Sequence, residues 1–148
     1  MSESCTCLDH VVGNTARLEF TVSATDTAIA LGSGSVNVLA TPMAIAWCEA
    51  ATTTAVATSI CIQCTTVGYK IEFTHLVPTP VGETVYSQAV VESVSGDRII
   101  FTVELRDTDT QVGMGRITRV RVDQARWHYL DAGCLTRIGH FRIGHHIY

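Results

Sequence analysis

The chain has 148 residues, of which 47% are hydrophobic and 16% charged, with a formal net charge of −4. This length fits a single domain with a substantial core, and the acidic balance without any basic run argues against nucleic-acid binding. The start of the chain does not have the pattern of a secretory leader, and no apolar stretch is long enough to span a membrane. We therefore expect a cytoplasmic protein without membrane attachment, whose six cysteines are mostly free thiols.

The first two segments differ in pattern. Residues 1–14 are polar and are expected to be loosely ordered. Residues 15–22 alternate between apolar and polar side chains, which predicts a half-buried strand. Its apolar positions are Ala16, Leu18, Phe20 and Val22.

The most apolar stretch, residues 38–57, predicts one long helix that is buried on most of its surface. Thr41 suits the N-cap position, because its hydroxyl can accept a hydrogen bond from an amide of the first turn. Pro42 suits the first helical position, where a missing N–H costs nothing. Glu49 is the only charged side chain in the stretch. A carboxylate there is costly unless it is paired or solvated, so Glu49 indicates either an exposed position or a functional group.

A CxxC pair, Cys61 and Cys64, follows this helix. A zinc site would need two further ligands, which Cys5 and Cys7 could provide only if the N-terminus folds back. We therefore expect the pair to act as buried small hydrophobic residues at a helix-to-strand junction, and we expect no metal site.

Residues 65–76 alternate again, which places His75 on the same face as Val67 and Ile71, at the end of a strand. Two polar side chains, Glu49 and His75, are thus predicted to lie on apolar faces that should form the core. A carboxylate that meets an imidazole satisfies both groups and gives a general base. We therefore expect these two side chains to form a pair.

Three more strands are predicted at 83–94, 98–107 and 111–122, joined by short turns. Gly113 and Gly115 interrupt the alternation of the last strand, which indicates a bulge or a close backbone approach. One strand, a long helix and a four-strand meander predict a two-layer α+β domain. Dimerisation is one way to protect the edges of such a sheet.

We interpret residues 1–148 as one domain, with a core at about 15–122 and a C-terminal extension at 123–148. Disorder or packing in a dimer is favoured over metal binding for the histidines of the extension. These histidines include His140, His145 and His146.

The elements and several short motifs resemble the hotdog fold of acyl-CoA thioesterases and, more closely, the fluoroacetyl-CoA thioesterase family. The motifs are V-L-A-T at 38–41, A-W-C-E-A at 46–50, V-G-Y at 67–69, F-T-H at 73–75 and E-S-V-S-G-D-R at 92–98. The resemblance covers about residues 15–122. It implies an antiparallel sheet of about five strands wrapped around one long central helix.

The resemblance also implies a site. Thr41, Glu49 and His75 fall on the catalytic positions of the family, and Gly68 and Pro42 are expected to bind substrate. The thioester carbonyl would lie near the start of the helix, where amides and the helix dipole stabilise an oxyanion. Glu49 would either attack the carbonyl or activate water. His75 would assist proton transfer, and Thr41 would provide hydrogen bonds.

The implied activity is that of a thioester hydrolase that cleaves a small or medium acyl-CoA to a free acid and CoA. No cofactor is expected, and the implied assembly is a homodimer, with a tetramer as the alternative and the sites near the interface. In the fluoroacetyl enzyme, phenylalanines before the helix cover the acyl group. Residues 31–38 contain no aromatic side chain, so fluoroacetyl selectivity is not expected.

The C-terminal third is basic, since residues 111–148 carry 6 basic and 2 acidic side chains. An anionic ligand such as the phosphates of CoA could be received there. The candidates by charge, each expected to be a plain surface residue rather than a ligand, are Lys70, Arg116, Arg119 and Arg121.

Three other functions were weighed. A non-catalytic hotdog protein that binds acyl-CoA or only dimerises would explain the fold but not the presence of both Glu49 and His75. A hotdog hydratase acting on enoyl-CoA would also use an acid and a histidine. A metal-binding role would use Cys61, Cys64 and the tail histidines.

Overall fold

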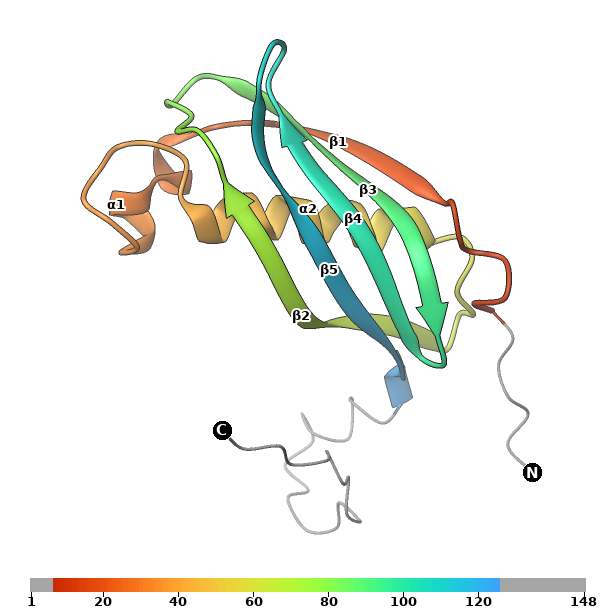
Figure 1. Ribbon diagram of the computed structural model, residues 1–148. Helices are drawn as coiled ribbons and strands as arrows, with labels where there is room; N and C mark the ends of the chain where they lie inside the picture. The colour runs from red at the N-terminus through yellow and green to blue at the C-terminus, as the bar shows by residue number, and fades with distance from the viewer. Residues whose placement is uncertain (1–6, 126–148) are drawn as a thin grey trace, which may run out of the picture.

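The computed structural model describes residues 7–125 and contains five antiparallel strands and one long helix (Figure 1). The strands lie in the order β1-β3-β4-β5-β2. The elements are β1 (Thr15–Thr21), η1 (Ala24–Asp26), α1 (Ala28–Leu31), α2 (Thr41–Val56), β2 (Cys64–His75), β3 (Thr84–Ser95), β4 (Arg98–Arg106) and β5 (Gln111–Asp123). This arrangement confirms the predicted α+β fold. The predicted four-strand meander is wrong, because β2 pairs with β5 instead of β3 and only β3, β4 and β5 follow one another in the sheet.

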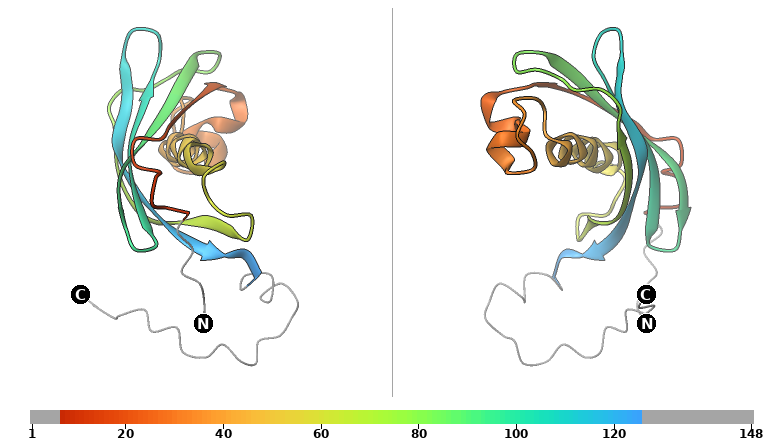
Figure 2. Two further views of the ribbon diagram at one scale, coloured as in Figure 1. Left: turned by 90° about the vertical axis from the view of Figure 1, so that its right-hand side faces the viewer. Right: turned by 60° about the vertical axis from the view of Figure 1, so that its left-hand side comes forward.

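The sheet curves around α2, which lies against its concave face (Figure 2). Small side chains on the buried side of the helix, such as Ala44 and Ala51, allow it to approach the strands closely. Larger side chains fill the remaining space, and the ring of Trp47 stacks on Phe20 of β1 with 4.7 Å between the ring centroids. The helix is therefore held by packing on the sheet rather than by its ends.

The inner face of β4 forms the centre of the core. Ile99, Phe101, Val103 and Leu105 are fully or almost fully buried, as the alternation of this strand predicted. Burial of each such large side chain contributes about 1.5–3 kcal/mol. Among the described residues, no helix is long and apolar enough to cross a membrane.

The N-terminal segment is packed, which corrects the expectation of loose order for the part of 1–14 that the structure describes. Leu8 and Val11 are buried, with 5% and 1% of their surface exposed. Asn14 donates hydrogen bonds from Nδ2 to the Ala55 carbonyl (3.3 Å) and to Ser59 Oγ (2.9 Å). The segment is therefore tied to the C-terminal end of α2.

The pairing of β2 with β5 contains the close backbone approach that the glycines indicated. A Cβ atom at Gly115 would lie 1.9 Å from the carbonyl oxygen of Glu72, and one at Gly113 would lie 2.4 Å from the ring of Phe73. Only glycine allows the two strands to come this close.

One prediction about β2 was wrong. The register against β5 shifts between Gly68 and Lys70, which leaves Tyr69 as an extra residue in a bulge. Gly68 pairs with the buried Arg119, so Gly68 faces the helix, whereas Val67 faces the other side. The bulge reverses the alternation that had placed Val67 with His75.

Candidate active site

Thr41 does not cap the helix, because its side chain contacts β2 instead. Ala40 is the N-cap residue, Thr41 is the first residue of α2, and Pro42 is the second. The Oγ1 atom of Thr41 lies 2.8 Å from Nδ1 of His75, at the end of β2. The N-cap residue Ala40 makes no side-chain capping hydrogen bond.

The environment of His75 favours the neutral imidazole. Burial lowers the pKa of His75 below its usual value of 6.5, and the backbone of Val77 partly opposes this shift. Its Nε2 atom is buried and has no hydrogen-bond partner among residues 7–125. In a neutral ring one nitrogen donates and the other accepts, so the tautomer decides which way the bond to Thr41 runs.

A cavity of about 340 Å³ lies beside this pair. Thr41 and Pro42 line it at the start of α2, and His75 lines it at the end of β2. Most of its other lining side chains are apolar. They are Ala28, Val36, Val38, Leu39, Leu76, Val77 and Pro78, with Ser33 as the polar exception. The cavity therefore combines an apolar wall with a hydroxyl and an imidazole.

Glu49 lies farther along α2 and pairs with Arg119 rather than with His75. Its Oε2 atom accepts a hydrogen bond of 2.8 Å from Nη1 of Arg119, and its side chain is 32% exposed. Gly68 faces the same carboxylate, since a Cβ atom there would lie 2.7 Å from Oε2. The expected pairing of Glu49 with His75 is not formed within one chain.

Arg119 is a buried residue of the site that the sequence interpretation placed on the surface. Besides its bond to Glu49, it donates two hydrogen bonds of 2.9 Å to the hydroxyl and the carbonyl of Thr66. Burial lowers the pKa of Arg119, and the charge of Glu49 opposes this shift. A buried guanidinium with three bonds is rigid, so it fixes the direction of the carboxylate.

The predicted residues thus form two clusters in the single chain. The Thr41–His75 cluster lies at the N-terminal end of α2, and the Glu49 cluster consists of Glu49, Gly68 and Arg119. The eight residues from Thr41 to Glu49 correspond to about 12 Å along the helix axis. One chain alone does not bring the two clusters together.

Two other candidates for CoA contacts, Lys70 and Arg116, are paired on the surface. Lys70 lies 3.3 Å from a carboxylate oxygen of Glu72, and both side chains are well exposed. Arg116 makes two hydrogen bonds to Glu92, of 2.8 and 3.0 Å. Exposed pairs of this kind contribute little to stability.

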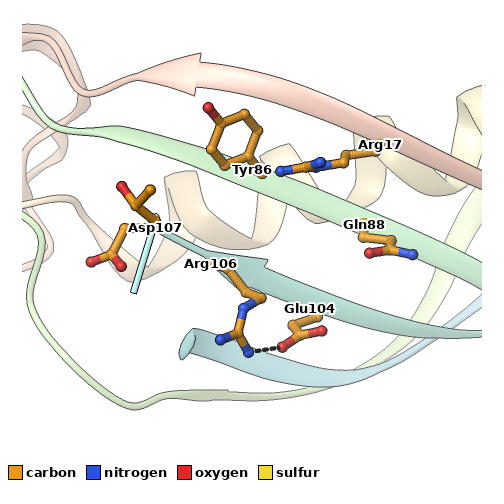
Figure 3. Close-up of a pocket in the computed structure, with 7 residues that line it drawn as sticks. Arg17, Tyr86, Gln88, Glu104, Arg106 and Asp107 are labelled. Carbon is orange, nitrogen blue, oxygen red and sulfur yellow. Dashed lines mark hydrogen bonds and ion pairs between the residues drawn. The ribbon is translucent and has the colours of Figure 1, made fainter. Parts of the chain in front are cut away.

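A second hollow, of about 240 Å³, lies on the outer face of the sheet (Figure 3). It contains none of the predicted site residues. Its charged groups are already engaged, since Arg106 donates to Glu104 at 2.7 Å and Arg17 lies over the ring of Tyr86. This hollow lacks the apolar wall of the cavity beside His75.

The sheet wrapped around α2, with a cavity at the helix start, has the hotdog fold of known thioester hydrolases. A structure of the fluoroacetyl-CoA thioesterase FlK is 25% identical, covers 82% of this chain and 94% of that chain, and gives a TM-score of 0.76. A variant of the same enzyme in complex with acetyl-CoA is 25% identical over 84% of this chain and 98% of that chain, with a TM-score of 0.77. A thioesterase superfamily member from Thermus thermophilus, 23% identical over 82% of this chain and 90% of that chain with a TM-score of 0.75, shares the fold.

The model of the fluoroacetyl-CoA-specific thioesterase family matches residues 22–125. The chain belongs to this family, which confirms the resemblance found in its motifs. No curated protein sequence is significantly similar to the chain.

Proposed function

We propose that this protein hydrolyses small or medium acyl-CoA thioesters to the free acid and CoA, using Thr41, Glu49 and His75. The observation that carries the proposal is the Thr41–His75 hydrogen bond in the lining of a mostly apolar cavity, at the start of α2. An acyl chain fits the apolar wall, and the thioester carbonyl then lies near the helix N-terminus. The partial positive charge there stabilises the oxyanion that forms during attack.

The reaction adds the elements of water across the carbonyl–sulfur bond. In one route Glu49 attacks the carbonyl carbon directly, which expels the thiolate and gives an acyl–Glu49 anhydride that water then hydrolyses. In the other route Glu49 takes a proton from the water that attacks the carbonyl carbon. The C–S bond breaks, the acyl group leaves as the acid, and the sulfur leaves as the CoA thiol after gaining a proton. His75, neutral at pH 7, assists the proton transfer, and Thr41 orients the ring through Nδ1. All of these groups come from the chain and from water, so the proposal includes no cofactor.

A homodimer would complete the site, because Glu49 and His75 lie apart in one chain. We place Glu49 of one subunit opposite Thr41 and His75 of the other. Support comes from β2, which is an edge strand of the sheet. It carries exposed apolar side chains, with Tyr69 57% and Ile71 40% exposed in the single chain. An open edge with such side chains is a surface that proteins normally cover.

The bulge in β2 suggests a register for this dimer. Two β2 strands related by a two-fold axis near Glu72 would run antiparallel, with Ile71 opposite Phe73 of the second subunit on the helix-facing side. At the bulge, two residues of one strand then face one residue of the second strand. Gly68 of one subunit therefore lies opposite His75 of the second subunit. Gly68 faces the Glu49 carboxylate, so each Glu49 would approach the other subunit's imidazole.

The acyl group is proposed to be unfluorinated and larger than a two-carbon unit. The segment 31–38, which lies before α2, contains no aromatic side chain. Val36 and Val38 line the cavity from this segment. Valines cover an acyl chain less completely than phenylalanine rings, so the cavity has room for further carbons.

Thiol release from a panel of acyl-CoAs tests the proposed function. Wild-type protein is expected to release CoA from short and medium substrates. Glu49→Gln, which keeps the size of the side chain and removes its charge, is expected to lower turnover on the order of a hundredfold or more. The function is refuted if no acyl-CoA is cleaved above background. The role of Glu49 is refuted if the variant matches the wild type.

A further inference from the structure

The sulfur atoms of three cysteines lie close together beyond the C-terminal end of α2, whereas the cavity lies at the start of this helix. The Sγ atoms of Cys7, Cys61 and Cys64 all lie within 4.8 Å of one another, and each residue is half-buried. Cys7 comes from the N-terminal segment, Cys61 comes from the turn between α2 and β2, and Cys64 is the first residue of β2. Chain segments more than fifty residues apart thus bring three thiols to one point.

The backbone holds these thiols in place. The amide of Cys64 donates to the carbonyl of Cys61 (2.9 Å), which closes the CxxC turn. The carbonyl of Gln63 in the same turn accepts from the amide of Gln124 (2.9 Å), just after the end of β5. On the other side, the buried Leu8 anchors the residue next to Cys7. Backbone hydrogen bonds and a buried neighbouring side chain therefore hold the three cysteines in place.

The geometry suits a thiophilic metal ion. In a tetrahedral zinc site, Zn–S bonds of about 2.3 Å place two sulfurs about 3.8 Å apart, within the spacing found here. A C-x-x-C turn that supplies two ligands is a common half of such sites. Thiolate ligands also select zinc over the harder divalent cations.

The surroundings fit bound thiolates as well. Arg121 donates from Nη1 to Cys7 Sγ (3.4 Å) and also pairs with Asp97. A guanidinium beside a thiolate ligand offsets its negative charge and fixes its direction, as outer partners of metal ligands do. This environment differs from the buried apolar setting that the sequence interpretation assigned to Cys61 and Cys64.

We propose that Cys7, Cys61 and Cys64 supply three thiolate ligands of a structural zinc ion. Three cysteines with one further ligand make a common type of structural zinc site. The ion would join the N-terminal segment to the α2–β2 turn, at the opposite end of α2 from Thr41. The proposal does not depend on thioesterase activity.

Zinc content of the full-length, untagged protein tests the site. Protein purified under reducing conditions with added zinc, then gel-filtered, is expected to retain about one equivalent per chain. Cys61→Ser and Cys64→Ser are each expected to lose most of it. Cys48→Ala is the matched control, because Cys48 is a free cysteine fully buried in α2 and away from the cluster, and it should keep the metal. Wild-type protein without zinc, or Cys61→Ser with full zinc, overturns the proposal.

Cobalt substitution identifies the ligands independently of folding defects. Co²⁺ bound by thiolates gives a sulfur-to-metal charge-transfer band in the near ultraviolet, which the tail histidines cannot produce. The band is expected in the wild type and in Cys48→Ala. A Cys61–Cys64 disulfide in freshly purified protein, found by mass spectrometry after alkylation, overturns the site itself.

Discussion

Mixed dimers of two inactive variants test whether each active site draws residues from both subunits. Glu49→Gln removes the carboxylate, and His75→Ala removes the imidazole. Each variant alone is expected to be inactive, because every site of its homodimer lacks one group. In a mixed dimer, one site loses both groups, while the other keeps the intact Glu49 of one chain and the intact His75 of the other.

The size of the recovery follows from counting sites. Free exchange of equal amounts of the two variants makes about half of the dimers mixed, and each mixed dimer holds one intact site of two. Activity should therefore return to about one quarter of the wild-type value per chain. If each site were built from one chain, mixing would restore nothing. We expect activity to return, because Thr41 and Glu49 of one chain are separated by about 12 Å along α2.

The assay is thiol release after the variants are unfolded together in denaturant and refolded, with each variant refolded alone for comparison. A second mixture, Thr41→Ala with His75→Ala, is the control. Thr41 and His75 are joined by a 2.8 Å hydrogen bond within one chain, so both sites of that mixed dimer lack one group and no activity should return. Recovery in the control, or none in the test mixture while both variants dimerise, refutes the shared site.

Three other results are expected. Gly68→Ala places a Cβ atom 2.7 Å from the Glu49 carboxylate, and the displaced group should lower kcat/KM by up to about a hundredfold with little change in Tm. Gly115→Ala puts a Cβ atom 1.9 Å from the Glu72 carbonyl, and urea unfolding should show a loss of more than about 3 kcal/mol. Burial lowers the pKa of His75, so kcat/KM should stay high on lowering the pH through 6.5 and fall only below it. Protonation of the buried ring should also lower the free energy of unfolding as the pH falls below 6.5.

The stability experiment and the pH experiment each have a matched control. For the stability experiment, Gly34→Ala is suitable, since its Cβ atom would meet only the Ala28 Cβ atom at 3.3 Å, and it should cost much less than Gly115→Ala. For the pH experiment, His75→Gln should abolish the acid limb of the stability curve. A wild-type kcat/KM that already declines above pH 7 would contradict a neutral, buried imidazole. Full activity in Gly68→Ala would show that the position of the Glu49 carboxylate is not critical.

The strands, the helix and the family could be predicted because their signals are local. Alternation over 98–107 identified the core face of β4, and the apolar run identified α2. Gly113 and Gly115 stood out because glycines inside a strand are costly unless the backbone needs them. Each of these patterns is decided within about a dozen neighbouring residues, so the sequence alone carries it.

The arrangement of the site depends on contacts between distant segments, and there the sequence predictions were less accurate. Thr41 was expected to cap the helix, but a residue at the end of β2 binds its hydroxyl. Arg119 was expected on the surface, although the alternation from the buried Ile117 could have placed it on the inner face. The bulge at Tyr69 could not be foreseen, because it exists only relative to β5.

The stacking of Trp47 on Phe20 gives the molecule an optical probe close to Glu49. Trp47 is 8% exposed and lies two residues before Glu49 on α2. The sequence contains one other tryptophan, Trp127, so a Trp127→Phe protein would emit from Trp47 alone. A shift in that emission on adding a non-hydrolysable CoA analogue would report ligand-induced movement of α2 against β1 in real time.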